Sequence, residues 1–344
     1  MRRRIPPFFA LSLVASALLP SAGVQAALPG APLWRVPETS LLGFRQDGLP
    51  VTRTFDRAAG KSLFRLDVRE PANGKVVATV DLVGIPPRAY LLAFTSDLKY
   101  LAWEDSDRLT VVTPTRRWTA KTPGLRGTRG PLFGPDGQTL AVANEYGYVQ
   151  LWDTGTGTRR TTLLFRIQPP QMLFSPDGQT LAVNEHYAFR RETSLSLWSK
   201  AGKPLGKVAG VNGASRGAFE FSADGQEILV EQPGYVLGWV NLRDGTARRW
   251  QSSFKPCSHG RQCVACAKVC RYALHATLTA ARERALVWTS DGAAMLYDAR
   301  AGTFLRSLPP GLNSAKLSPD GRQAYKWGYD EAARATSLRA WKLP

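Results

Sequence analysis

Leu132-Phe-Gly-Pro-Asp-Gly-Gln-Thr-Leu-Ala-Val142 returns along the chain as Leu173-Phe-Ser-Pro-Asp-Gly-Gln-Thr-Leu-Ala-Val183. Looser copies are Glu220-Phe-Ser-Ala-Asp-Gly-Gln-Glu-Ile-Leu-Val230 and Lys316-Leu-Ser-Pro-Asp-Gly-Arg322. In the shared core, Pro presets one turn angle and Gly tolerates a positive φ, so the chain reverses tightly. Apolar, β-prone residues stand on both sides of this turn. Each copy therefore predicts two antiparallel strands joined by a short turn.

The turn aspartate, or the residue in its place, marks seven units in the sequence. The markers stand at positions 47, 97, 136, 177, 224, 281 and 320, which lie 39 to 57 residues apart. Four-stranded propeller blades repeat about every 40–45 residues. No segment shows a convincing helical periodicity with caps. We therefore predict an all-β fold, a seven-bladed β-propeller of four-stranded blades.

Both ends of the repeat region support a closed ring. The last unit stops at a third strand, Leu338 to Leu343, and Leu33 to Val36 is a strand-like piece without a blade of its own. Pairing the two would complete the last blade and cover two exposed strand edges. Tryptophans recur at two repeat positions, which indicates packing between blades. They are Trp152, Trp198, Trp239 and Trp341 at one position, and Trp103, Trp288 and Trp327 at the other.

These repeats resemble the WD40-like repeat family, including the Ser-Pro-Asp-Gly repeats of bacterial propellers. The family's Trp-Asp dipeptide occurs at Trp152-Asp153, and Tyr297-Asp298 is related to it. The family's Gly-His dipeptide is absent, so we do not expect its buried hydrogen-bond tetrad. The resemblance implies a propeller over almost all of the chain after its leader. It also implies binding through the central channel or through the face formed by the inter-blade and second-to-third-strand loops.

The first 26 residues have the pattern of a cleaved signal peptide. Arg2 to Arg4 form a positive region, Phe8 to Leu19 an apolar core, and Val24-Gln25-Ala26 a small-residue cleavage site. The apolar core is too short to span a bilayer, which requires about 20 residues. We expect residues 27–344 to form one exported domain, periplasmic or extracellular, monomeric and without a transmembrane segment.

The irregular loops collect on one face, which we call the loop face. There we expect the lengthened loops 185–192 and 328–334, and a set of arginine and aromatic residues in position to contact a partner. This set is Arg88, Arg126, Arg129, Tyr187, Phe189, Arg190, Arg191, Arg216, Arg261 and Arg271. The formal net charge of +18 favours anionic surroundings. Partner candidates are another protein or an anionic envelope component, and we do not expect nucleic acid.

All four cysteines lie in one insert at about 255–272, between blades five and six. They are Cys257, Cys263, Cys266 and Cys270. An even number in an exported protein favours two disulfides. Four thiolates, with His259 as an alternate ligand, could instead hold zinc, and the spacing is related to iron–sulfur runs without matching them.

No catalytic motif emerges from the sequence. It contains no His-Glu-x-x-His pair and no phosphate loop. We therefore expect an exported, non-enzymatic interaction module without a cofactor. The alternative is a propeller enzyme or metal-site protein that uses the central channel or the four-cysteine insert.

Overall fold

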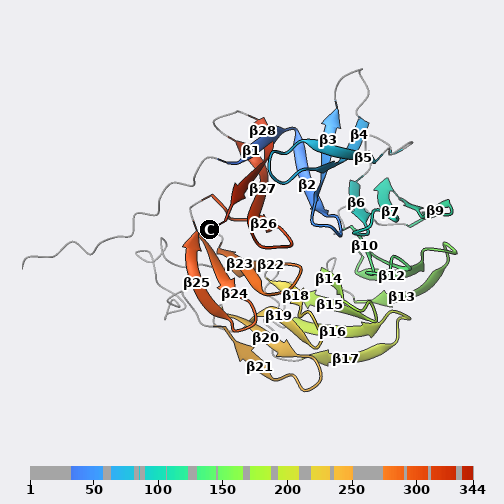
Figure 1. Cartoon of the computed structure of the whole chain (residues 1–344). Coiled ribbons are helices and arrows are strands. Elements are labelled where there is room, and N and C mark those ends of the chain that lie inside the picture. Colours follow the sequence, from blue (N-terminus) through green and yellow to red (C-terminus); the bar gives the residue numbers. More distant parts are fainter. Residues whose placement is uncertain are drawn as a thin grey trace, which may run out of the picture.

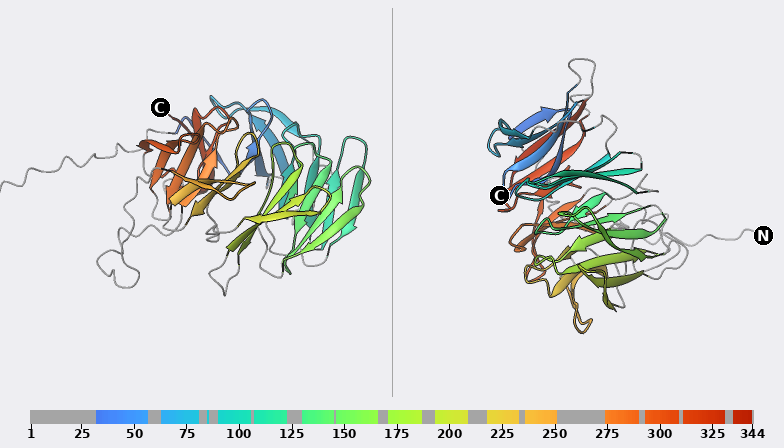
Figure 2. Two further views of the ribbon diagram at one scale, coloured as in Figure 1. Left: turned by 90° about the horizontal axis from the view of Figure 1, so that it is seen from below. Right: turned by 90° about the vertical axis from the view of Figure 1, so that its right-hand side faces the viewer.

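The chain folds into seven four-stranded antiparallel sheets arranged as the blades of a β-propeller. The computed structural model describes residues 32–56, 63–80, 85, 90–105, 107–122, 130–144, 146–165, 171–186, 193–208, 218–232, 236–250, 274–289, 293–308, 311–330 and 335–343. Figure 1 shows the blades following one another around a ring in chain order, and Figure 2 shows the ring from two further sides. The described residues contain no helix, and hence none that could cross a membrane. The predicted fold class is confirmed.

Each blade is a meander in which the first strand is innermost and the fourth outermost. Blades one to three are β2 (Thr39–Phe44), β3 (Pro50–Asp56), β4 (Leu63–Arg69), β5 (Val76–Val80); β6 (Tyr90–Phe94), β7 (Leu101–Asp105), β8 (Arg108–Val112), β9 (Arg117–Lys121); β10 (Pro131–Phe133), β11 (Thr139–Ala143), β12 (Tyr148–Asp153), β13 (Arg159–Leu164).

Blades four to seven continue the pattern, except that the first strand in the chain supplies the last outer strand. They are β14 (Gln171–Phe174), β15 (Thr180–His186), β16 (Thr193–Ser199), β17 (Pro204–Val208); β18 (Phe219–Phe221), β19 (Glu227–Gln232), β20 (Val236–Asn241), β21 (Ala247–Arg249); β22 (Leu274–Leu278), β23 (Arg284–Thr289), β24 (Ala294–Asp298), β25 (Thr303–Leu308); β26 (Lys316–Leu317), β27 (Gln323–Asp330), β28 (Ala335–Lys342), β1 (Trp34–Pro37).

The core consists of apolar layers between successive blades. Six such layers are present among the described residues, and five of them draw buried side chains from two neighbouring blades. In the sixth, at the seam, the buried side chains come from blade seven and blade one adds the partly buried Leu41 and Phe44. Trp152 packs toward blade two, where it stacks on Trp118 with 5.7 Å between ring centres. Trp239 packs between blades five and six and donates from its indole nitrogen to Ala299 O at 2.6 Å. The expected packing of the recurring tryptophans between blades is confirmed at these two positions.

The Ser-Pro-Asp-Gly turns are held by their own side chains. In blade four, Ser175 Oγ donates to Asp177 Oδ1 at 2.5 Å and accepts from the backbone N of Thr180 at 2.9 Å. Gly178 supplies the positive φ, at 69°. The hydrogen bond from Ser175 is the main reason that the pKa of Asp177 is lowered. The motif therefore fixes the turn and keeps its carboxylate ionised.

Two blades make the same turn without the glycine. Leu98 in blade two and Arg282 in blade six occupy its position with φ of 60° and 57°. In blade six, Thr279 Oγ1 accepts from the backbone N of Glu283 and of Arg284, both at 3.2 Å. A side chain in this region costs roughly 1–2 kcal/mol. The turn geometry thus persists where the sequence signal has faded.

The ring closes through the N-terminal strand, as the sequence predicts. β1 pairs antiparallel with β28, from Trp34 opposite Ala340 to Pro37 opposite Ser337. Trp34 is 8% exposed, and its indole nitrogen donates to Pro71 O of blade one at 2.7 Å. A Cβ added to Gly74, which has φ of 73°, would lie 2.7 Å from the indole, so only glycine fits there. Strand pairing on one side and an inserted indole on the other join blades seven and one.

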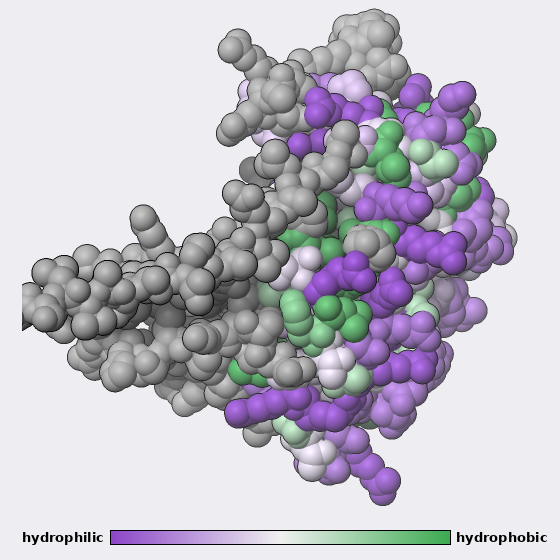
Figure 3. Space-filling view, turned by 60° about the vertical axis from the view of Figure 1, so that its left-hand side comes forward, coloured by the Kyte–Doolittle hydropathy of each residue, from purple (hydrophilic) through white to green (hydrophobic). Residues whose placement is uncertain are grey.

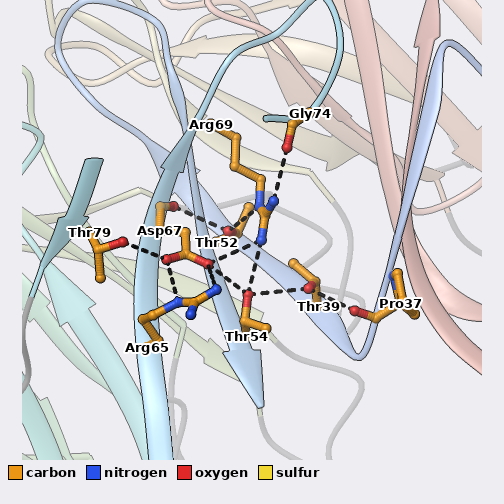
Figure 4. A network of polar contacts seen from close by, with 9 residues as sticks. All are labelled: Pro37, Thr39, Thr52, Thr54, Arg65, Asp67, Arg69, Gly74 and Thr79. Atoms are coloured by element: carbon orange, nitrogen blue, oxygen red, sulfur yellow. Dashed lines mark hydrogen bonds and ion pairs between the residues drawn. The ribbon is translucent and has the colours of Figure 1, made fainter. Parts of the chain in front are cut away.

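A buried polar network lies on the blade-one side of this seam (Figure 4). Asp67, with no exposed surface, is surrounded by donors. They are Arg65 Nε at 2.7 Å, Arg65 Nη2 at 3.0 Å, Arg69 Nη2 at 3.1 Å, Thr54 Oγ1 at 3.1 Å and Thr79 Oγ1 at 3.0 Å. Arg69 also donates to Gly74 O at 2.9 Å, which links the network to the turn that holds Trp34. Because the buried charges are paired and hydrogen-bonded, the desolvation cost is offset.

Candidate functional site

The meander sends its connections to two different faces. Turns between first and second strands and between third and fourth strands share one face, the turn face. Hairpins between second and third strands and the inter-blade connections share the other, which is the loop face defined above. On the turn face, backbone bonds repeat from blade to blade, such as Lys200 N to Gln179 O at 2.9 Å and Leu242 N to Gln226 O at 2.9 Å. That face is regular, and differences between blades concentrate on the loop face.

A cavity of about 450 Å³ lies where the innermost strands of blades three to six begin. Its lining residues are Gly130, Pro131, Leu132, Gln171, Met172, Phe219, Glu220 and Ala276. A first strand follows an inter-blade connection, so its beginning lies at the loop face. The cavity is therefore the loop-face end of the central channel. Its size lies within the range of about 300–1,000 Å³ typical of ligand pockets.

Charged side chains stand along this channel. Glu220 on β18 forms an ion pair with Arg282 from the blade-six turn, with 2.7 Å between Oε2 and Nη1. Lys316 on β26 directs Nζ toward Leu42 O of blade one at 3.4 Å. The surrounding protein desolvates this ammonium group and lowers the pKa of Lys316, while the charge of Glu220 acts in the opposite direction. The contact of Lys316 with Leu42 O connects the innermost strands of the neighbouring blades seven and one.

Exposed Trp and Tyr side chains of the described residues all belong to the loop face. Tyr146 and Tyr148 lie at the β11–β12 hairpin of blade three and are 61% and 37% exposed. Trp327 and Tyr329 lie near the end of β27 in blade seven and are 53% and 63% exposed. Two residues apart on one strand, Trp327 and Tyr329 point to the same side. Figure 1 places these two blades on roughly opposite sides of the ring, so the channel mouth lies between the two aromatic pairs.

Trp327 corrects an expectation from the sequence, in which this recurring residue should pack between blades. Its counterpart in blade six, Trp288, stacks on His275 of the innermost strand at 5.4 Å. In blade seven the innermost strand comprises only Lys316–Leu317, and Ser314 before it has a left-handed φ of 64°. The strand neighbour that covers Trp288 is thus missing, and Trp327 faces outward. The expected loop 328–334 is also shorter, because β27 continues to Asp330.

The partner-contact residues chosen from the sequence lie outside the described residues. These are Arg88, Arg126, Arg129, Tyr187, Phe189, Arg190, Arg191, Arg216, Arg261 and Arg271. The insert with Cys257, His259, Cys263, Cys266 and Cys270 also lies outside them. In the part of the chain that the structure describes, no three His, Cys, Asp or Glu side chains group closely enough to hold a metal ion. The structure adds Glu220, Lys316 and the four exposed aromatic residues, none of which the sequence placed among the partner-contact residues.

Comparison with known proteins supports the repeat architecture. No protein-family model matches the chain. A protein of Deinococcus radiodurans described as an uncharacterized WD repeat-containing protein is 30% identical to it over 203 residues, which cover 54% of this chain and 74% of the relative. Sequence repeats, seven four-stranded blades and this relative agree, and the chain belongs to the WD repeat family.

Proposed function

We propose that the protein is an exported interaction module that binds a partner protein through its loop face, with the partner crossing the mouth of the central channel. The WD repeat propeller is a rigid ring, and its fold supports a role in protein interaction. Its loop face is the part that varies from blade to blade. Binding and catalytic residues concentrate on loops that a rigid scaffold positions.

The observation that carries the proposal is the placement of the exposed aromatic residues. Tyr146, Tyr148, Trp327 and Tyr329 are the exposed Trp and Tyr side chains among the described residues, and the turn face has none of them. Trp, Tyr and Arg are enriched among the residues that carry most binding energy at protein interfaces. Exposing two aromatic residues on one strand leaves apolar surface uncovered, which a partner would bury.

The channel mouth lies between the two aromatic pairs of the loop face, at the centre of the proposed binding surface. An extended segment that touched the aromatic pairs of blades three and seven would pass over the cavity lined by Leu132, Met172 and Phe219. One of its side chains could enter the cavity, where Glu220 and Gln171 offer polar contacts. Such an arrangement combines apolar anchors at two points with a polar pocket between them, as in well-packed interfaces.

Site-specific photo-crosslinking in the native host tests the proposal. A photoreactive residue at position 146 or 329 should crosslink the same protein, whereas one at the turn-face position Lys99 should not. The Trp327→Ala change should then weaken binding of that purified partner at least about tenfold, as expected for an interface anchor worth more than about 1.4 kcal/mol. Phe304→Ala, which removes an exposed aromatic residue from an outermost strand, is the control and should leave affinity unchanged. Crosslinking from position 99 alone would reverse the assignment of faces.

Export and the state of the cysteines belong to the same proposal. Mass spectrometry of the protein from its host should show a chain that begins at Ala27, and a retained Met1 would contradict cleavage after residue 26. In the same preparation, we propose that the four cysteines form two disulfides. Alkylation of the denatured, unreduced protein should then label none of them. Labelling together with stoichiometric zinc or iron would instead support the metal-site alternative.

A further inference from the structure

We infer that the circumference of the propeller is a second binding surface, for a flexible linear polymer that carries phosphate groups along its length. This surface, here called the rim, consists of the outermost strands β1, β5, β9, β13, β17, β21 and β25. It is separate from the loop face and uses none of the residues assigned there.

Charge on the rim has one sign. None of its seven strands contains an Asp or Glu. Six of them contain exposed cations; of the exposed flanking residues, Lys75 precedes β5 and Glu38 follows β1. The cations within the strands are Arg35, Arg117, Lys121, Arg159, Arg160, Lys207, Arg248, Arg249 and Arg306. In contrast, the second strands contain acids such as Glu104, Glu227 and Glu231. Positive charge therefore gathers at the outside of the disc.

Part of this charge is already neutralised and part is not. Arg160 pairs with Asp153, and Arg248 pairs with Glu227 at 3.1 Å, both on the side of the turn face. Among the described residues, Arg159, Arg249 and Arg306 have no ion pair or hydrogen bond through their side chains. These three lie on blades three, five and six and provide guanidinium groups that can each engage a phosphate.

Protection of strand edges explains some of this pattern but not its uniformity. Charged side chains on an outermost strand prevent edge-to-edge pairing with another molecule. Either sign of charge would keep an edge soluble, and mixed signs are the usual composition of a protein surface. A rim without a single acidic residue also creates a positive field that attracts and retains polyanions. On the face seen in Figure 3, hydrophilic residues cover much of the described outer surface, with hydrophobic ones between them.

The distribution of the cations selects a flexible linear partner. They occur in successive blades around the ring, so a flat membrane could reach only one arc of them (Figure 1). Duplex DNA, with a persistence length of about 50 nm, is too stiff to follow a domain whose radius of gyration is roughly 20 Å. Single phosphate ions would meet isolated cations and bind weakly. A flexible chain of phosphates can contact several blades at once and gains affinity through multivalency.

Binding of long-chain inorganic polyphosphate at a series of salt concentrations tests the inference. Replacing three unpaired rim arginines by R159Q, R249Q and R306Q should reduce the slope of log K against log salt by about 2, at roughly 0.7 per lost contact. Affinity at low salt should fall on the order of tenfold or more. The matched control carries K200Q, K203Q and R243Q on the turn face, three cations that also form no ion pair among the described residues, and both its slope and its affinity should stay near those of the unmodified protein. Thermal unfolding verifies that both triple variants fold, and R159K, R249K and R306K should restore the slope.

Several results would overturn the inference. One is an equal loss of affinity and slope in the turn-face control, since the effect would then depend on net charge alone and not on the rim. Failure of the unmodified protein to bind polyphosphate at low salt is another. Competition by orthophosphate at the same phosphate concentration would indicate a single-ion site, and stronger binding to anionic vesicles would indicate a membrane. Binding of the crosslinked partner protein through Trp327 should persist in the rim variant, so the two proposals can fail independently.

Discussion

Removal of the Trp34 side chain should loosen the ring at its seam. The indole is 8% exposed, lies 5.8 Å from the ring of Tyr325 between centres, and donates to Pro71 O at 2.7 Å. Replacing a buried Trp by Ala costs about 3–5 kcal/mol because of the lost transfer free energy and the cavity left behind. Most of this loss applies here, since the indole fills the space over Gly74. We expect Trp34→Ala to lower the free energy of unfolding by about 4 kcal/mol.

Urea unfolding followed by circular dichroism measures this change. With an m value of roughly 3–4 kcal/mol/M for a chain of this size, the midpoint should fall by about 1 M. Leu33→Ala is the control, because Leu33 is the adjacent residue and 44% exposed, and it should change the free energy of unfolding by less than about 0.5 kcal/mol.

Hydrogen exchange locates the weakened region. In Trp34→Ala, amides of β1 and β28 should exchange faster at low denaturant than those of blades three to five, because the seam can open before the rest unfolds. A loss below about 1 kcal/mol, or exchange that accelerates equally in every blade, would refute the role of Trp34 as the closing contact.

Four other perturbations test the fold and the insert. Asp67→Asn should lower the free energy of unfolding by about 3–5 kcal/mol, because it leaves the Arg69 guanidinium buried without a counter-charge. The apolar double variant Asp67→Leu with Arg69→Met should lower it by less in the same urea assay. The hydrogen bond from Ser175 lowers the pKa of Asp177 in the folded protein. The ionised carboxylate therefore contributes to stability above the unfolded-state pKa of about 3.9, and this contribution is lost as the pH falls below that value. Urea midpoints should drop on acidification, and they should drop less in Ser175→Ala. Gly302→Ala should exceed Gly245→Ala in cost by about 1–3 kcal/mol in thermal unfolding, because both have a left-handed φ but only the first Cβ would strike an indole, at 2.4 Å. Reduction of the proposed disulfides in the insert 255–272 should lower stability by about 2–4 kcal/mol, whereas a chelator should have no effect.

Repeated local chemistry explains how much of the fold the sequence predicts. Turns such as Ser175–Gly178 are held by contacts within a few residues, so the motif and the structure coincide. Motif and structure also agree on the closure of the ring by β1. The strand edges left unpaired at the two ends of the repeat region, β1 and β28, have only each other as partners. Even in blade six, where the motif is lost, Thr279 supplies equivalent turn contacts, and a count of seven units remained correct.

Prediction failed where a side chain's environment depends on a neighbouring strand. Trp327 and Trp288 share a repeat position, yet only Trp288 has an innermost strand long enough to cover it. The Arg65-x-Asp67-x-Arg69 alternation is typical of a strand with one solvated face. In blade one Asp67 and Arg69 are instead buried at the seam, where donors from three strands surround Asp67, whereas Arg65 stays exposed. Third strands of the other blades are mostly buried at the same position, so the burial of Asp67 follows the repeat.

The architecture separates stability from recognition. Stability comes from layers between blades, from turns such as that at Asp177, and from the seam around Trp34. The exposed aromatic residues of the loop face belong to none of the layers among the described residues, so Trp327 and Tyr329 can be changed, or stay exposed, without weakening a layer. The rim arginines likewise lie outside every apolar layer, so replacing them should not weaken the fold. If this separation holds, Trp327→Ala and the three rim substitutions will alter binding while leaving the urea midpoint within about 0.3 M of the unmodified protein.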